Sequence, residues 1–288
     1  MGRLTFVTMI RATVALAGAA HPQPTVAVTA GAAALAVVSG RDWPGIAAVA
    51  LAVLASQLAV GWHNDWLDAE RDRAAQRRDK PIAVGDVSAH SVAVAAVVAA
   101  AAEIPLGLLS GWRAALAGAI GLGSALAYNW PLKFTPLSPL PYVVSFGALP
   151  AFVLLGRPGA DGVPWWLIGA SATLGAGAHF ANVLPDLDDD LRQGVRGLPQ
   201  RLGRPASTAI AAVLVMAVSL LLAFGPAGLP RPAGIIGLAA AVLTLAAGGC
   251  LQWHRPRSHS AFRAVLVVVM IDVGLLVAAG ALIQPAAS

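Results

Sequence analysis

The sequence predicts an all-α membrane protein, a bundle of nine transmembrane helices, and three observations predict it. Hydrophobic residues make up 58% of the 288 residues and charged residues only 11%, whereas a soluble domain carries about 25% charged residues. The apolar residues fall into runs of about 17–25, the length at which a helix crosses ~30 Å of hydrocarbon. The basic residues alternate between the loops as a membrane topology requires.

The predicted helices follow from the apolar runs and their interruptions. Residues 4–20 contain Arg11 within an apolar stretch, which predicts an interfacial helix that ends at Pro22 and Pro24. The single cysteine, Cys250, lies in an apolar run, which excludes a disulfide framework and a cysteine metal site. The nine predicted spans cover about residues 22–39, 44–62, 88–109, 112–128, 139–155, 163–184, 206–225, 232–251 and 264–284.

The distribution of basic residues predicts the orientation. With the N-terminus in the cytoplasm, 15 of the 19 Lys and Arg residues fall on cytoplasmic segments. The other four occupy one outside loop each: Arg41, Arg113, Arg157 and Arg231. Short cytoplasmic loops concentrate Lys and Arg, so the predicted topology is N-in and C-out. The sequence pI of about 10.3 is therefore assigned to loops at an anionic membrane surface, and no nucleic-acid partner is expected.

Ten of the 14 acidic residues lie in two segments that form an internal repeat. The first segment holds Asp65, Asp68, Glu70, Asp72, Asp79 and Asp86, and the second holds Asp186, Asp188, Asp189 and Asp190. Six identical pairs are each separated by 118 positions: Asn64 and Asn182, Asp68 and Asp186, Asp72 and Asp190, Arg78 and Arg196, Pro81 and Pro199, Gly85 and Gly203. This predicts a single domain, residues 1–288, with four-helix pseudo-repeats at about 22–138 and 139–255 plus one further helix.

The spacing within each acidic segment predicts a shared helical face. An α-helix turns about 100° per residue, so Asn64, Asp65, Asp68 and Asp72 fall within an arc of roughly 100°. Asn182, Asp186 and Asp190 fall within roughly 80°. We expect each segment to form one oxygen-rich face at the cytoplasmic end of a membrane span.

Such faces are suited to hard metal ions. Clustered carboxylates near hydrocarbon repel one another, and a divalent cation relieves the repulsion. Oxygen ligands without Cys or His favour Mg²⁺ or Ca²⁺ over Zn²⁺. Two opposed faces could hold a diphosphate between metal ions and neutralise it as a C–O bond breaks. Nearby basic residues predicted to bind the phosphates are Arg71, Arg77, Arg78, Lys80, Lys133 and Arg196.

The motifs resemble those of the UbiA superfamily of intramembrane prenyltransferases. "NDWLDAERD" at 64–72 fits that family's N-D-x-x-D-x-x-x-D motif, and "DLDDD" at 186–190 fits its second motif, D-x-x-x-D. The segments "KPIAVG" at 80–85, "YNWPLK" at 128–133 and "GVRGLPQRLG" at 194–203 are similar to family segments beside the two motifs. The resemblance covers nearly the whole chain.

The resemblance implies a Mg²⁺-dependent transfer of a prenyl group from a prenyl diphosphate to a lipophilic, commonly aromatic, acceptor. It implies metal and diphosphate binding by Asn64, Asp65, Asp68, Asp72, Asp186 and Asp190, with Asp68, Asp72, Asp186 and Asp190 as the catalytic acids. Some relatives have a further acid where Val183 stands here. The acceptor class stays open among quinone, chlorophyll, haem, glycerol-phosphate and phosphoribosyl routes.

Other intramembrane polar and aromatic residues have two interpretations each. Glu103 and Asp272 either line a substrate cavity or pack against a neighbouring helix. His179 is expected at a helix interface, and His63 does not by itself indicate a metal site. The aromatic residues near the cytoplasmic ends form an interfacial belt or face a developing allyl cation: Trp62, Trp66, Tyr128, Trp130 and Phe180.

Two other functions compete with prenyl transfer. A CDP-alcohol phosphotransferase also uses clustered Asp residues, but the only Asp-Gly pair here, Asp161 and Gly162, falls in a predicted outside loop. A transporter with parallel repeats would place its sites near the midplane of the bilayer, not at helix ends. Arg outnumbers Lys 17 to 2, which together with the abundant Ala suggests a bacterial source and hence the plasma membrane.

Overall fold

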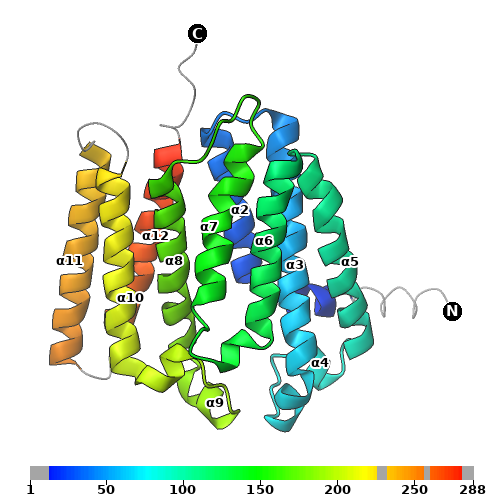
Figure 1. The fold of residues 1–288 in the computed structure, drawn as a ribbon. Coiled ribbons are helices and arrows are strands. Elements are labelled where there is room, and N and C mark those ends of the chain that lie inside the picture. The colour runs from blue at the N-terminus through cyan, green and yellow to red at the C-terminus, as the bar shows by residue number, and fades with distance from the viewer. Residues whose placement is uncertain (1–12, 226–231, 256–259, 281–288) are drawn as a thin grey trace.

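The structure, a computed structural model, describes residues 13–225, 232–255 and 260–280. Within these residues all regular structure is helical, and the long helices run side by side in one bundle (Figure 1). The elements are α2 (Pro22–Val38), α3 (Trp43–Ala74), α4 (Pro81–Val84), α5 (Ala89–Leu108), α6 (Trp112–Asn129), the 3₁₀ turn η1 (Leu132–Phe134), α7 (Leu140–Leu155), α8 (Trp165–Val183), α9 (Leu187–Arg192), α10 (Leu198–Phe224), α11 (Pro232–His254) and α12 (Ser260–Gly280).

Each predicted span coincides with one of the long helices. Five described helices are long and apolar enough to cross a membrane: α3, α5, α10, α11 and residues 260–277 of α12. Of the predicted interfacial helix, residues 13–19 are helical, and residues 1–12 lie outside the described part, as do Arg231 and residues 281–284. The all-helical membrane fold is confirmed, while the number of spans and the orientation stay predictions.

Several helices begin at residues that the sequence makes suitable. The Asp42 carboxylate accepts a hydrogen bond of 3.0 Å from the backbone N–H of Gly45 at the start of α3. The Ser88 hydroxyl accepts one of 3.0 Å from the N–H of Ser91 at the start of α5. Each cap satisfies a donor that the first helical turn leaves free.

Exposed tryptophans mark two levels along the bundle. Trp43, Trp112 and Trp165 are each the first residue of a helix and are at least 71% exposed. Trp130, which follows α6, is also exposed. Trp112 begins α6 and Trp130 directly follows its 18 residues. About 27 Å therefore separates these two tryptophans, close to the thickness of the hydrocarbon core. Tryptophan favours the interface between membrane and water, so these levels are typical of a protein embedded in a bilayer.

The helix packing in the first half recurs in the second. α3 packs along α5 and α8 along α10, while α2 contacts α3 and α7 contacts α8. Likewise α6 contacts α5 and α7, and α11 contacts α10 and α12. A shift of 118 positions relates the members of each pair, which supports the internal repeat that we retain as a proposal.

A buried arginine closes one end of the bundle. Arg41, between α2 and α3, is 8% exposed. Its Nη1 donates to the carbonyl of Val153 at 3.1 Å, and its Nη2 donates to Oγ of Ser110 at 3.0 Å. These bonds join the α2–α3 connection to the α5–α6 connection and to the last turn of α7. They lie at the end of the bundle opposite the acidic segments, because α3 starts at this end and carries its acids near its other terminus.

Candidate active site

The first acidic segment lies on an extension of α3. The helix continues without interruption from the predicted span, which ends at residue 62, to Ala74. The predicted single helical face for Asn64, Asp65, Asp68 and Asp72 therefore agrees with the backbone. Asp65 and Asp72 are buried, whereas Asn64 and Asp68 are partly exposed.

Lys133 is the direct partner of this segment. Its Nζ donates to both carboxylate oxygens of Asp68, at 2.8 and 2.9 Å, and to Oδ1 of Asn64 at 3.2 Å. Arg71 forms a second ion pair with Asp68. Burial lowers the pKa of the Lys133 ammonium group, and the charge of Asp68 opposes that effect. Lys133 belongs to η1 and is 65 positions beyond Asp68 in the sequence, and the structure brings the two side chains together.

Asp65 makes a separate set of contacts. Its Oδ1 accepts from Nζ of Lys80 at 2.7 Å and lies 2.8 Å from Nε2 of His21. Lys80 also lies 3.2 Å from His21 Nε2. Two residues predicted for metal and diphosphate binding are thus ion-paired with each other. Sequence reasoning missed His21, because nothing in the sequence relates the start of α2 to the end of α3.

The second acidic segment is not one continuous helical face, and that prediction is wrong. α8 ends at Val183, residues 184–186 form a turn, and α9 begins at Leu187. The cause is Pro185, since proline lacks the N–H of a helix interior and disfavours helical backbone at the residue before it. A related correction applies to α10, which begins at Leu198 rather than at 206 and is broken at Gly203.

The partners of the second segment differ from those of the first. Asp190 accepts a hydrogen bond of 2.8 Å from the neutral Nε2 of Gln200. Asp188 pairs with Arg204 at 3.1 Å, and Asp189 pairs with Arg192. No ion pair to Asp186 or Asp190 occurs among the described residues.

The same backbone turn follows both acidic segments. The N–H of Arg77 donates to the carbonyl of Asp72 at 3.0 Å, and the N–H of Val195 donates to that of Asp190 at 2.9 Å. Gln76 and Gly194, the residues before these donors, have left-handed backbones with φ of 53° and 80°. This six-to-one bond with a left-handed residue is the Schellman arrangement. Gly85 and Gly203, also 118 positions apart, have φ of 86° and 80°.

The two acidic segments lie at the same end of the bundle, with α9 near the lower ends of α3 and α4 (Figure 1). Burial raises the pKa of the Asp190 carboxyl; the hydrogen bond from Gln200 opposes this, and the charges of Asp186 and Asp68 raise it further. The pKa of Arg77 is raised mainly by its bonds to Asp79 and more weakly by Asp186. Acids of one segment therefore lie within electrostatic range of groups on the other.

The connection between α6 and α7 is packed against the second segment. Oγ of Ser138 accepts from the backbone N–H of Leu198 at 2.9 Å and lies 3.0 Å from Nε2 of His179. A Cβ on Gly197 would come within 2.9 Å of the carbonyl oxygen of Lys133, so only glycine allows this approach. The contact fixes Lys133 between the two acidic segments.

Aromatic rings line the bundle next to the acids. The ring of Tyr142 lies 5.0 Å from that of Tyr128, 4.8 Å from that of His179 and 6.2 Å from that of Phe146. His179 is 1% exposed, which agrees with the predicted helix-interface position, and Phe180 packs beside it. These rings form an aromatic wall between the acidic groups and the interior of the bundle.

The remaining predicted residues make contacts outside the Lys133 and Asp190 groups. Arg77 forms two hydrogen bonds to Asp79, at 2.9 and 2.8 Å, and Arg78 and Arg196 are exposed. Trp62 donates a hydrogen bond to the carbonyl of Leu16, and Trp66 and Trp130 are exposed.

Two further polar residues have partners on neighbouring helices. Nδ1 of His63 lies 3.3 Å from Nδ2 of Asn129. Asp272 is fully buried and accepts a hydrogen bond of 2.6 Å from Ser219 of α10, as the packing interpretation predicted.

The donor set fits a hard divalent cation. In the part of the chain that the structure describes, no three acidic, His or Cys side chains already converge on one point. Asp190 nevertheless combines partial burial, like-charged neighbours and a neutral hydrogen-bond partner. A divalent cation between Asp190, Asp186 and Asp68 would compensate these charges, and the ligands would be oxygen atoms only.

Comparisons with known proteins agree with this arrangement. The sequence profile of the UbiA prenyltransferase family matches residues 25–280. A 4-hydroxybenzoate octaprenyltransferase from Cupriavidus necator is 29% identical over 69% of this chain and 72% of its own length. A digeranylgeranylglyceryl phosphate synthase from Methanopyrus kandleri is 29% identical over 76% of this chain and 81% of its own.

A solved structure shares the fold. The UbiA homolog from Archaeoglobus fulgidus, bound to GPP and Mg²⁺, superposes with a TM-score of 0.69 and 14% identity, over 93% of this chain and 99% of that one. At that identity the likeness establishes the arrangement of helices alone.

Proposed function

The chain belongs to the UbiA prenyltransferase family, and from that premise we propose that two acidic segments and Lys133 hold the diphosphate of a prenyl donor at one end of the bundle. The protein is an integral membrane prenyltransferase that uses a prenyl diphosphate. The residue roles, the metal and the acceptor given below are proposals.

The convergence of the two acidic segments around Lys133 supports this assignment. Lys133 bonds to Asp68 and Asn64 on one side and lies within electrostatic range of Asp190 on the other. A diphosphate that enters this space would replace Asp68 as the anionic partner of Lys133. Mg²⁺ bound by Asn64, Asp68, Asp72, Asp186 and Asp190 would supply the positive charge that stabilises the leaving diphosphate.

The side chains have distinct roles in the proposed reaction. The C–O bond between the prenyl group and the diphosphate breaks, and the diphosphate keeps the electron pair. Lys133 donates hydrogen bonds to the phosphate oxygens as their charge grows. Tyr128, Tyr142 and His179 line the adjacent space and keep water from the prenyl carbon until the acceptor bonds to it and releases a proton.

The acceptor is proposed to be a lipophilic molecule. The two relatives differ in this respect, because one is named for hydroxybenzoate and the other for a glyceryl phosphate lipid. We place the site at the cytoplasmic face of a bacterial plasma membrane, with nine spans in the N-in and C-out topology, because most basic residues then face the cytoplasm.

The competing functions have less support. Asp161 and Gly162, the only pair available to a CDP-alcohol phosphotransferase motif, lie in the irregular segment between α7 and α8. That segment is at the start of α8, whereas the acids follow its end. A transporter would need the acids at mid-membrane depth, but the first segment extends α3 beyond its apolar part.

The decisive experiment measures Mg²⁺-dependent release of diphosphate from a prenyl diphosphate by the purified protein. Asp68→Ala and Asp186→Ala are each expected to lower kcat by about 10²–10³-fold, as for the loss of other charge-stabilising groups. Asp188→Ala is the matched control, because its side chain is 70% exposed and pairs with Arg204. Full activity in either folded test variant would exclude the proposed site.

A further inference from the structure

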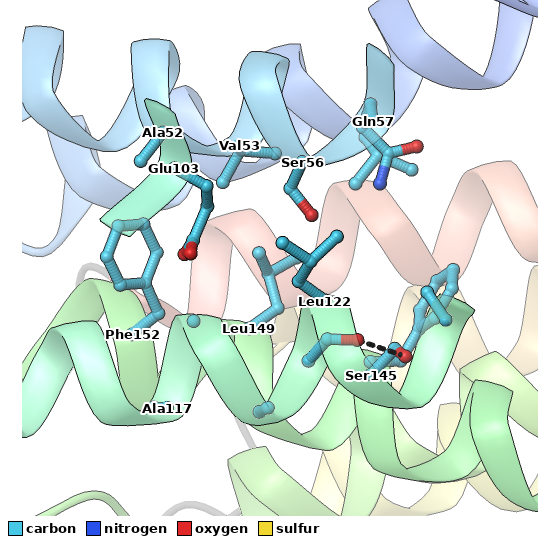
Figure 2. A pocket seen from close by; sticks show the side chains of 16 residues that line it. Ala52, Val53, Ser56, Gln57, Glu103, Ala117, Leu122, Ser145, Leu149 and Phe152 are labelled. Atoms are coloured by element: carbon cyan, nitrogen blue, oxygen red, sulfur yellow. Dashed lines mark hydrogen bonds between the residues drawn. The ribbon is translucent and has the colours of Figure 1, made fainter. Parts of the chain in front are cut away.

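A cavity lies deeper in the bundle than the acidic segments. It encloses about 70 Å³ between α2, α3, α5, α6 and α7. Most of its wall is apolar and includes Leu122, Leu149 and Phe146, and polar groups of Gln57 and Ser145 also reach it (Figure 2). The proposed diphosphate site does not use this space.

Glu103 contributes an unusual group to the cavity. Its side chain points into the space from α5 (Figure 2), and the residue is only 2% exposed. Among the described residues its carboxyl group has no ion pair and no hydrogen bond. A Cβ on Gly118 would lie 2.5 Å from Oε1 of Glu103, so the glycine provides the room that the carboxyl occupies. A buried ionisable residue within a membrane span is a candidate for function by default.

The cavity lies in line with the diphosphate site. Gln57 and Asn64 are seven residues apart on α3 and share a helical face. Phe146, which lines the cavity, stacks on Tyr142, and Tyr142 packs against Tyr128 and His179 beside the acids. A chain attached to a diphosphate near Asn64 would pass these rings and enter the cavity.

Glu103 and Phe152 lie at the far end of this path. Phe152 is 2% exposed and belongs to the main core cluster with Val153 and Ala114, which are both fully buried. At the outer side of that cluster Arg41 bonds to the Val153 carbonyl and to Ser110. The cavity therefore has a closed floor.

The depth of the floor can be estimated along α3. Val53, which lines the cavity with Glu103, is eleven residues from Asn64, or about 16 Å at 1.5 Å per residue. An extended chain advances roughly 1.2 Å per bond, as the polypeptide does over its three backbone bonds, so a four-bond isoprene unit spans about 5 Å. About three units fit between the diphosphate site and the floor.

We propose that Glu103 and Phe152 form the floor of the prenyl-chain cavity and that Glu103 limits the donor to about three isoprene units. A longer chain would press an apolar end against the Glu103 carboxyl and leave its oxygens without water or another partner, which is costly. This inference rests on the proposed function and adds the length of the donor to it. The limit would set the chain apart from its relative named as an octaprenyltransferase.

The test measures binding, so that it does not depend on the acceptor. Dissociation constants of diphosphates with two, three, four and eight isoprene units are measured by calorimetry in Mg²⁺ buffer, with the purified protein in lipid nanodiscs. The wild type is expected to prefer three units over four by at least tenfold, within the range that one misfitting apolar group produces. Glu103→Leu should reduce that ratio by about tenfold, whereas Glu103→Gln should retain it.

Ile104→Leu is the control on the same helix, because Ile104 is 56% exposed on the outer face; the ratio should not change in it. If the wild type binds all lengths equally, or if Glu103→Leu leaves the ratio unchanged, the floor proposal is wrong while the proposed function stands. If no prenyl diphosphate binds at all, the proposed function itself fails.

Discussion

The two acidic segments have the same spacing of acids and are followed by the same Schellman turn, but their ion-pair and hydrogen-bond partners differ. In the first, Asp68 and Asp65 are each held by protein cations, Lys133 with Arg71 and Lys80 respectively. In the second, the Asp190 carboxylate accepts a hydrogen bond from the neutral Gln200, and neither Asp186 nor Asp190 has an ion pair among the described residues. Asp65 and Asp68 are therefore already compensated by protein cations, whereas Asp186 and Asp190 are not.

The difference has a basis in the aligned sequence. At 118 positions beyond His21, Asp65 and Lys80 stand Pro139, Val183 and Leu198. Val183 is buried with Leu184 and Leu187 in a small apolar cluster, so the second half replaces a polar trio by an apolar one. This indicates that the repeated Asn and Asp positions serve a shared purpose, while Asp65 and Lys80 stabilise only the first half. We infer that a divalent cation binds first at the second segment.

The strongest test of this comparison removes the uncompensated charge. Asp190→Asn should lower kcat by about 10²–10³-fold. It should also abolish the rise in Tm that we expect from Mg²⁺, because a ligand stabilises the folded state only when its concentration approaches or exceeds its Kd. The measurement is thermal unfolding of the purified protein over a Mg²⁺ titration. Asp189→Asn is the control, since Asp189 pairs with Arg192 at the surface. A Mg²⁺-dependent Tm that survives in Asp190→Asn would contradict the inferred order of binding.

A second test replaces Asp65 and Lys80 by the apolar residue types that stand 118 positions later, Val and Leu. Asp65→Val should lower the free energy of unfolding by about 3 kcal/mol, because it leaves Lys80 unpaired in a site where only 16% of its side chain is exposed. The double variant Asp65→Val with Lys80→Leu should recover most of that loss, as apolar replacement of a whole buried pair usually does. Denaturation in detergent measures both.

The same double variant separates the two roles of Asp65. If it is stable and still releases diphosphate, Asp65 and Lys80 stabilise the fold and are not needed for the reaction. If it is stable but inactive, the pair takes part in metal or phosphate binding instead. If the double variant is as unstable as Asp65→Val alone, apolar residues cannot replace the Asp65–Lys80 pair in the first half.

The smallest expected change in stability concerns the Schellman turns at Gln76 and Gly194. Gly194→Ala should cost about 1 kcal/mol of stability, because φ of 80° strains any residue with a Cβ. Gln76→Gly should have the opposite sign, with a gain of about 0.5 kcal/mol, since Gln76 already pays that strain at φ of 53°. A Cβ at Gly194 meets no atom within 4 Å, so the backbone alone is tested. Equal losses in both variants would contradict an equivalent turn.

Much of the fold could be predicted because a membrane helix is determined by local composition. Apolar runs placed all the long helices to within a few residues, apart from the polar extension of α3 and the start of α10. Hydropathy gives no signal at either place, since residues 63–74 and 198–205 are helical but not apolar. The break at Pro185 is readable from the sequence, because proline disfavours a helical backbone at the residue before it, whereas the periodic spacing of the acids by itself predicts a continuous helix.

The sequence predicts the end of the bundle at which the candidate site lies, but not the contacts within it. The repeated spacing predicts that Asp68, Asp186 and Asp190 lie at one end of the bundle, and α9 does lie near the lower end of α3 (Figure 1). It could not show that Lys133 bonds to Asp68 and Asn64, that Lys80 turns to Asp65, or that His21 joins them. These contacts join residues 15 to 69 positions apart, and such pairings depend on how the helices pack.

The polar extension of α3 carries a consequence for how products depart. Twelve residues of the helix project past the predicted span, and Asn64, Asp68 and Asp72 are among them. We expect spent pyrophosphate to escape directly into water, whereas the alkylated product stays dissolved among the lipid tails. One reaction would thus sort its two products between two solvents, with neither obstructing the exit of the other.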